Sequence, residues 1–507
     1  MALATFFSRI LGLVREQFIA YLFGASGLTD AFLVAYRIPN LLRDLFAEGA
    51  FSSAFVPTFV EANQKDPESA KKLFWSLFIL LGMITLVCSG VTIYFTPEII
   101  NIFAPTFIND PHKFETTVLL TRIMAPFLFF VSIAALFMGV LNSLKIFFIP
   151  SFAPAFFNVT TIICMIVLPP FLIKYGYEPI LSLAIGVIVG GLVQALVQFP
   201  LIIKNGYGPT RPSKIFSKET KKVLTLLGPG LIGFAATQIN LIINTILASS
   251  TVIGAVSWLS FAFRLFQLPV GILSVSIGNS NLVHFSNAWK KGDKEEAIES
   301  LSSSFFLSCA LVFPAMIGLI VFSEEIVNII FQRGKFDAES TLMTAKALRL
   351  YALGLPFYSI YKIFVPTFYA IDRQRIPVIC SILGIIFNIV FCMSLTDKYG
   401  FEVLALGTTL SIFLNVLIQG NILTSDLNIK LTLFFNLRFL KLILSGTVTS
   451  VIVLFIRDQF EFITFSFLER CLLVFFYLSS IVISYFSLCV ILGERALIKR
   501  VFSKFKR

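Results

Sequence analysis

The amino-acid sequence predicts an all-α polytopic membrane protein with about 14 transmembrane helices. The first observation is composition: of 507 residues, 57% are hydrophobic and 13% are charged, whereas a soluble chain carries about 25% charged residues. The second is a succession of apolar runs of about 20 residues, the length at which a helix crosses a bilayer. The third is the placement of Lys and Arg between these runs, which fits an even number of crossings.

The apolar runs follow one another along the whole chain, and several exceed the length that a bilayer requires. The second and eighth contain Pro39 and Pro269, so we expect kinked or broken helices there. Arg9 and Arg15 interrupt the first run, and no clean apolar stretch with a small-residue cleavage site follows, so we expect this helix to be retained. The predicted spans lie near residues 4–24, 29–60, 73–97, 117–144, 151–173, 179–203, 220–249, 252–285, 300–323, 340–368, 376–396, 401–424, 436–456 and 470–494.

The predicted orientation depends on the charges between the spans. A cytoplasmic N-terminus places most of the basic stretches on the cytoplasmic side, where Lys and Arg accumulate in membrane proteins. The sequence therefore predicts a multi-pass protein with both termini in the cytoplasm. These stretches are "NQKDPESAKK", "KNGYGPTRPSKIFSKETKK", "NAWKKGDKEE", "DRQR" and the tail "RALIKRVFSKFKR".

Domain boundaries follow from the longest basic loop, residues 204–222, which comes after the sixth span. We expect this linker to join an N-terminal lobe, residues 1–203, to a second six-helix lobe, residues 223–424. The last helix pair and a basic tail occupy residues 425–507. A weak internal repeat agrees, because Arg37 precedes Pro39 in one lobe and Arg264 precedes Pro269 in the other. Repeated lobes with a binding site at their interface are common in transporters.

The sequence offers no cofactor site, metal cluster or enzyme active site. The seven cysteines lie in or beside apolar spans without a C-x-x-C pair, which is typical of small buried hydrophobic residues. His112 and His284 are isolated, so no zinc cluster is expected. There is no phosphate-binding G-x-x-x-x-G-K-[ST] loop for an ATP-driven pump, and no basic block interleaved with aromatics that would bind nucleic acid.

Four arginines, Arg9, Arg15, Arg43 and Arg264, interrupt predicted spans. A charge at the bilayer centre costs about 2.5–3.5 kcal/mol, so four facing lipid would cost on the order of 10 kcal/mol, comparable to the net stability of a protein. They must therefore face protein or a wet cavity. Snorkelling of Arg9 to the cytoplasmic surface and purely structural ion pairs remain open alternatives. Arg264 has no acidic residue in its span, which favours an anion supplied by a substrate.

Arginine binds phosphate through bidentate, charge-assisted hydrogen bonds. Several arginines on one cavity suit a diphosphate better than a neutral or cationic drug, for which a cavity with acidic residues would be expected. The residues alone therefore predict a transporter of a phosphorylated amphiphile.

Six characteristic stretches follow one another along nearly the whole chain. They are "SRILGLVRE", "GLTDAFLVAYRIPNLLRDLFAEGAFSSAFVP", "FIPSFAPAFFN", "QINLIINTILAS", "FQRGKFDA" and "PTFYAIDRQRIPV". Together and in this order they resemble the MurJ/MviN family, bacterial lipid II flippases of the MOP exporter superfamily. The resemblance implies two six-helix lobes in a V, with the C-terminal helix pair forming a groove for the undecaprenyl tail.

The resemblance also implies roles for individual residues. The substrate-binding arginines of the family match Arg9, Arg15, Arg43 and Arg264, and the cavity and gate residues match Glu16, Asp30 and Asn158. The acidic residue that follows the second arginine is usually Asp in the family, and Glu16 has a longer side chain.

This sequence departs from the family pattern at two places. Phe263 and Gln267 stand where some members carry acidic residues beside the eighth-helix arginine, so we expect a more cationic cavity. Part of the family has a sodium site; Asn388 matches one of its ligands, but Cys392 stands where an aspartate is expected. We therefore expect no metal site.

The function expected from the residues and the resemblance is transport of lipid II from the inner to the outer leaflet of the bacterial cytoplasmic membrane by alternating access. Its partners would be lipid II and membrane lipids, with association with other cell-wall synthesis proteins left open. One alternative is an exporter of another polyprenyl-diphosphate-linked glycan. Another is a membrane glycosyltransferase or polymerase, which needs carboxylates in a sizeable outer loop; the longest one, residues 97–116, has only Glu98, Asp110 and Glu115 and no D-x-D pair. A scaffold without transport activity also remains open.

Overall fold

The structure is a computed structural model that describes residues 2–47, 50–212, 214–460 and 462–499. Every regular element within those residues is a helix, so the predicted all-α fold is confirmed. The chain forms two compact units, Met1–Ser257 and Trp258–Arg507. The lobe and linker boundaries drawn from the loop charges remain a prediction.

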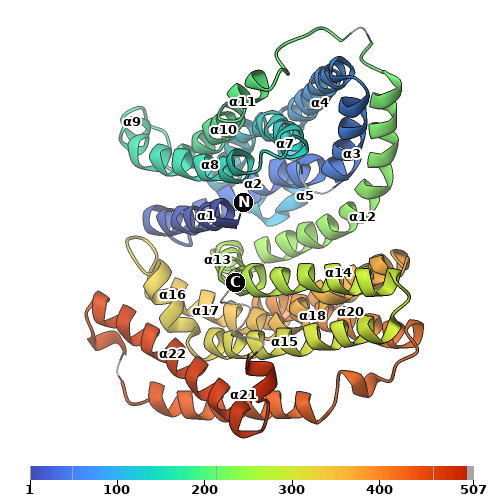
Figure 1. Cartoon of the computed structure of the whole chain (residues 1–507). Coiled ribbons are helices and arrows are strands. Elements are labelled where there is room, and N and C mark those ends of the chain that lie inside the picture. The colour runs from blue at the N-terminus through green and yellow to red at the C-terminus, as the bar shows by residue number, and fades with distance from the viewer. Residues whose placement is uncertain (1, 48–49, 213, 461, 500–507) are drawn as a thin grey trace. The chain divides into compact units, whose positions relative to one another are not determined.

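Among its described residues, the first unit contains the helices α1 to α12, the short 3₁₀ helix η1 and the start of α13 (Figure 1). Several helices begin where the sequence supplies a capping side chain followed by proline: Asp66 accepts from two backbone N–H groups of α4, and Asp110 accepts from one of α6. The elements are α1 (Ala2–Phe23), α2 (Gly27–Ala47), α3 (Ala50–Lys65), α4 (Pro67–Tyr94), α5 (Thr96–Phe103), η1 (Pro105–Asn109), α6 (Pro111–Met124), α7 (Phe127–Ser143), α8 (Phe148–Val167), α9 (Pro169–Lys174), α10 (Leu181–Leu196), α11 (Phe199–Lys204) and α12 (Lys218–Ser249).

The second unit holds most of α13 and all later elements (Figure 1). It packs around α15, which lies against α14, α18, α21 and α22. The elements are α13 (Ala255–Pro269), the π-helical η2 (Val270–Ser274), α14 (Val275–Lys290), α15 (Lys294–Val321), α16 (Ser323–Phe331), α17 (Ala338–Ala352), α18 (Leu355–Ala370), α19 (Arg375–Tyr399), α20 (Glu402–Asp426), η3 (Leu431–Leu433), α21 (Leu437–Arg457), η4 (Phe462–Thr464) and α22 (Phe467–Ile491).

Ten segments among the described residues are long and apolar enough to cross a membrane. Four predicted spans, 4–24, 29–60, 220–249 and 340–368, are not among them. Helix α1 carries Arg9, Arg15 and Glu16 within 22 residues, and α17 and α18 are separate helices that meet at Leu353–Gly354. The membrane-protein class is therefore confirmed, while the count of fourteen crossings remains a prediction.

The two predicted helix breaks differ. Helix α13 passes at Pro269 into the π-helical segment Val270–Ser274, which leads directly into α14. The regular α-helix is interrupted there, but the chain stays helical from Ala255 to Lys290. Helix α2 continues through Pro39 to Ala47 without ending.

Small residues bring helices of the first unit close together. Gly186 and Gly190 of α10 face α8, where an added Cβ would lie 3.1 Å from the Cα of Thr161 and 2.8 Å from Phe157, respectively. Glycine at such positions lets backbones approach, a common device in membrane helices. The hydroxyl of Thr161 then donates to the carbonyl oxygen of Gly186 over 3.2 Å.

An ion cluster joins α3 to α12 in the same unit. Glu61 accepts from Lys222 over 2.6 Å and from Lys65 over 2.8 Å. These two cations lower the pKa of the Glu61 carboxyl to about 2, and Lys222 contributes more than Lys65. The helix that carries the end of the basic loop is thereby tied to α3.

A second cluster attaches the C-terminal helix pair to the rest of its unit. The Arg457 guanidinium at the end of α21 donates to Glu325 of α16 over 2.5 Å and lies 3.9 Å from Glu324. Arg349 of α17 pairs with Glu324 over 2.6 Å. Glu325 is only 4% exposed, so the loss of Arg457 would leave a buried carboxylate without its nearest cation.

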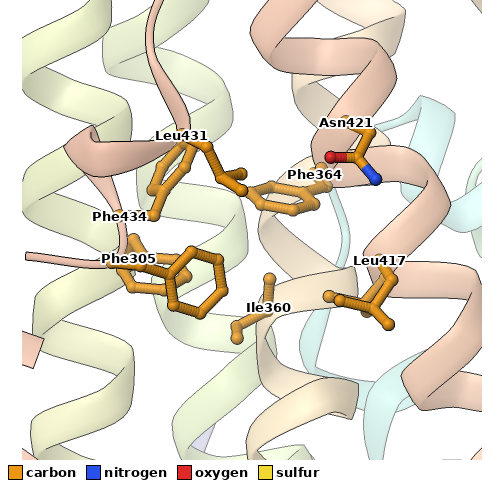
Figure 2. Close-up of a pocket in the computed structure, with 10 residues that line it drawn as sticks. Phe305, Ile360, Phe364, Leu417, Asn421, Leu431 and Phe434 are labelled. Carbon is orange, nitrogen blue, oxygen red and sulfur yellow. The ribbon is translucent and has the colours of Figure 1, made fainter.

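A small apolar pocket of about 50 Å³ opens beside α15 in the second unit (Figure 2). Figure 2 shows Phe305, Ile360 and Phe364 pointing toward one another, with Asn421 at the edge. Asn421 is the single polar residue of the lining. Since a buried water needs two to four polar partners, the lining favours apolar contents.

Candidate functional site

Arg15 is the most enclosed of the predicted arginines whose surroundings the structure details. Its side chain is 12% exposed, and it donates to the neighbouring Glu16 over 2.7 Å. The guanidinium carbon lies 5.5 Å from the ring centroid of Phe157 on α8, within the range of a cation–π contact. The buried Nε of Arg15 has no hydrogen-bond partner among the described residues, which leaves a donor available to an anion.

The other two predicted arginines of the first unit lie on α1 and α2. Arg9 is exposed and Arg43 is half-buried. Arg43 is close enough to Arg15 for the two charges to repel. An anion placed between like charges would relieve that repulsion.

Arg264 lies on the part of α13 that belongs to the second unit, and its side chain is exposed. The neighbouring Phe263 packs against the rings of Phe266 and Tyr351. The convergence of Arg264 with the three arginines of the first unit remains a prediction.

Asn158 connects α8 to α1. Its side-chain amide donates to the carbonyl oxygen of Ser8 over 3.2 Å and lies beside Gly12, where an added Cβ would be 3.6 Å away. Glu16 is 5% exposed. Asn158 therefore fixes the part of α1 that carries Arg9, and Glu16 orients Arg15.

Asp30 forms the most fully satisfied polar site of the first unit. The residue is 1% exposed. Its Oδ2 accepts from the backbone N–H of Gly254 over 2.7 Å, and its Oδ1 accepts from the N–H and hydroxyl of Ser257 over 2.9 and 2.6 Å. Because these N–H groups belong to the first turn of α13, Asp30 caps that helix from α2 and receives the favourable end of its dipole.

Sequence reasoning did not identify the partners of Asp30. Gly254 and Ser257 lie 224 and 227 residues away along the chain. The third partner is Lys113, whose Nζ is 3.8 Å from Oδ2. The available signal was the glycine of "TVIGAVS", which adopts a φ of 94° just before α13.

The residues at the family's sodium site do not fit a sodium ion in this chain. Asn388 and Cys392 are fully buried, and the Cys392 sulfur lies 3.5 Å from the Asn388 Oδ1 and 3.8 Å from the carbonyl oxygen of Val403. A hard cation requires oxygen ligands, and a thiol supplies neither the oxygen nor the charge of the expected aspartate. Among the described residues, no three His, Cys, Asp or Glu side chains gather as a metal site.

The described residues form helices alone, and ten segments among them are long and apolar enough to cross a membrane, which defines the class of polytopic α-helical membrane proteins. The chain shares its fold with an inward-facing MATE multidrug transporter of the MOP superfamily, with a TM-score of 0.68, 12% identity, and coverage of 83% of this chain and 95% of that one. Within this class, the chain belongs to the lipid II flippase MurJ family, because the model of that family matches residues 19–473.

Two curated relatives and one solved structure are similar to this chain over most of its length. A probable lipid II flippase MurJ of Bdellovibrio bacteriovorus is 34% identical over 427 residues, 83% of this chain and 80% of the relative. The lipid II flippase MurJ of Burkholderia cenocepacia is 38% identical over 381 residues, 74% and 73% of the two chains. A solved structure of lipid II flippase MurJ in an inward closed conformation matches with a TM-score of 0.79 and 29% identity, covering 98% of this chain and 99% of that one.

Proposed function

We propose that this protein translocates lipid II from the inner to the outer leaflet of the bacterial cytoplasmic membrane, and so serves peptidoglycan and cell-wall synthesis. The observation that carries the proposal is Arg15, an enclosed cation whose Nε has no partner among the described residues. A diphosphate is the kind of group that satisfies such a donor. The identity of the rest of the substrate is inferred from the membership of the chain in the flippase family.

In the proposed mechanism, an inward-facing cavity captures the diphosphate through Arg9, Arg15, Arg43 and Arg264. The lipid tail stays in the membrane beside α21 and α22, and residues 204–222 link two lobes that rock around the headgroup. Binding neutralises cations that repel one another, and a pair of unit charges 4 Å apart at an effective dielectric of 20 interacts by about 4 kcal/mol. That is enough to bias two conformations.

In this mechanism the three hydrogen bonds from Gly254 and Ser257 to Asp30 form a latch, which holds the first turn of α13 against α2. Helix α13 also carries Arg264. Releasing and remaking this cap would accompany the change between the two states. Glu16 and Asn158 support the latch indirectly by holding α1 and the Arg15 side chain in place.

Resetting the empty transporter returns an unneutralised cationic cavity toward the cytoplasm. Each charge that crosses the full field gains about 2.3 kcal/mol per 100 mV, so an inside-negative potential favours the return. Both termini are proposed to lie in the cytoplasm, which sets the direction of this motion. Collapse of the potential at constant ion gradients should stop flipping, and unchanged flipping would exclude potential-driven resetting.

The proposal is tested by complementation in a bacterium whose own lipid II flippase can be switched off. The wild-type chain should restore growth and cell shape, whereas Arg15→Ala and Arg264→Ala should not, each at equal membrane expression. Arg211→Ala, which removes an exposed cation in the basic loop, is the matched control and should rescue fully.

The other outcomes are informative too. Full rescue by Arg15→Ala would show that the enclosed arginine does not bind the substrate. Failure of the wild type despite good expression would count against lipid II, and vesicle transport assays with another polyprenyl-diphosphate-linked glycan would then test the leading alternative.

A further inference from the structure

Lys113 is a buried cation that the proposed binding site does not use. It lies in the first turn of α6 and is 8% exposed. Its Nζ is 3.8 Å from Asp30 Oδ2 and 3.8 Å from the ring centroid of Phe107 in η1. Its aliphatic carbons pass Gly27, where an added Cβ would lie 3.8 and 3.9 Å from Cδ and Cε. Three elements, α2, η1 and α6, therefore hold this side chain toward Asp30.

We propose that Lys113 is the positioning residue of the Asp30 latch, the counter-ion that keeps the carboxylate charged and aimed at the first turn of α13. This inference rests on the proposed flippase function for its role in transport. The geometry of the site supports it independently of the substrate.

A buried carboxylate needs compensation, because removal from water disfavours its charged form. Among the described residues, Lys113 is the only Lys or Arg whose nitrogen lies within 4.0 Å of Asp30. Hydrogen bonds to a charged acceptor are roughly twice as strong as those between neutral groups. The three bonds that Asp30 accepts from Gly254 and Ser257 therefore depend on the charge that Lys113 maintains.

The separation of 3.8 Å is longer than a hydrogen bond. Lys113 thus supplies positive charge without occupying an oxygen lone pair that the turn needs. The contact with Phe107 and the packing against Gly27 fix the ammonium at this distance. The compensating charge therefore comes from α6, whereas the hydrogen bonds to the carboxylate come from the first turn of α13.

This division has a consequence for a latch that must open. When the first turn of α13 leaves Asp30, the carboxylate loses its three donors but retains its counter-ion, since Lys113 is held by elements other than α13. The open state therefore does not strand an uncompensated buried charge. Lys113 would make the latch reversible as well as strong.

The test is hydrogen–deuterium exchange on the full-length protein in lipid nanodiscs, read at the backbone amides of Gly254 and Ser257. Lys113→Met should speed exchange there by about tenfold, which corresponds to about 1.4 kcal/mol of opening free energy. Lys113→Arg should keep protection near the wild-type level. Lys174→Met, which removes an exposed lysine of the predicted outer side, should change nothing at the turn. Exchange in α19 and α20 reports whether each variant is folded.

A double-mutant cycle separates positioning from general support. If Lys113 acts through Asp30, Lys113→Met should add little to Asp30→Asn, because the neutral amide needs no counter-ion. An equal increase in exchange in both backgrounds, or no increase in the single variant, would overturn the proposal. Should Lys113→Met fail to fold, Lys113→Arg still decides. This variant retains the positive charge, so a loss of protection at Gly254 and Ser257 in the wild-type background would contradict the proposed charge compensation.

The exchange measurement requires no transport. If the wild type fails in complementation but Lys113→Met loosens the turn, the latch stands and the substrate assignment falls. If the wild type flips lipid II and Lys113→Met leaves the turn protected, the flippase function stands and the role of Lys113 falls.

Discussion

The contact between Arg457 and Glu325 provides a sharp test of how the C-terminal helix pair is held. Replacement of Arg457 by methionine keeps most of the side-chain volume and removes the cation at the end of α21. Glu325 would then retain a carboxylate that is 5% exposed at the side chain, without the guanidinium that lies 2.5 Å away. The expected result is destabilisation.

The magnitude follows from the burial of the two partners. Loss of one partner of a buried pair costs about 3–5 kcal/mol, whereas an exposed pair contributes about 0–1 kcal/mol. Because Arg457 keeps 29% of its side chain exposed while Glu325 is buried, we expect an intermediate cost of about 2 kcal/mol. Glu325→Gln should cost less, since it leaves no buried charge, and the double variant should resemble Glu325→Gln.

The assay is unfolding of the purified protein in mixed micelles, followed by tryptophan fluorescence and by the rate of irreversible inactivation on heating. Arg375→Met, an exposed cation at the start of α19, is the matched control. Two results would refute the reasoning: an effect of Arg457→Met no larger than that of the control, or additivity of the two single variants within about 0.5 kcal/mol.

Three further predictions concern packing, pH and ions. Gly420 leaves room for a methyl group, 3.5 Å from the Phe364 ring, so Gly420→Ala should raise thermal stability by up to about 1 kcal/mol. At Gly278 the methyl group would collide with a backbone carbonyl, so Gly278→Ala should lower thermal stability. A shift of both variants in the same direction would contradict the packing described for these two glycines. Because the pKa of Glu61 is lowered from 4.5 to about 2, its ion pairs stabilise the fold above pH 4.5 and are lost as pH falls toward 2; the difference in melting temperature between wild type and Glu61→Gln should vanish over that interval, and a constant difference would show that the charge is not responsible. Since Cys392 provides a thiol where a sodium ligand would be needed, flipping in proteoliposomes should persist when Na⁺ is replaced by choline at a fixed membrane potential, and a loss of flipping would mean that other residues bind the ion.

The sequence predicted the fold class well because apolar length is a local property. Each of the ten segments that are long and apolar enough to cross a membrane can be recognised without knowledge of its neighbours. Two of the other predicted spans are interrupted locally: charges interrupt α1, and Leu353–Gly354 divides a long apolar stretch into two shorter helices. Such interruptions are visible in the sequence, but whether a helix tolerates them depends on what packs against it.

The candidate site was predictable in its residue types and not in its pairings. That Asp30 is buried follows from its place in an apolar stretch, yet its donors come from the start of α13, more than 200 residues away. Likewise Asn158, matched to a gate residue, contacts the backbone of α1 at Ser8. Long-range contacts of this kind arise from tertiary packing, which helical periodicity does not encode.

The π-helical segment after Pro269 contains one residue more than a regular helix would need. A π turn takes up one more residue than an α turn, whereas each residue of an α-helix rotates the chain by about 100°. Deletion of one residue from Val270–Ser274 would let the segment close into an ordinary α-helix, and the residues beyond it would keep their facing. Gly278, which faces the backbone of Lys362 at a distance no side chain permits, would still face α18. A deletion in α14 between this segment and Gly278 would instead turn the helix beyond it by about 100° and bring a larger residue against α18. Single-residue deletions should therefore be tolerated better within these five positions than in the first turn of α14.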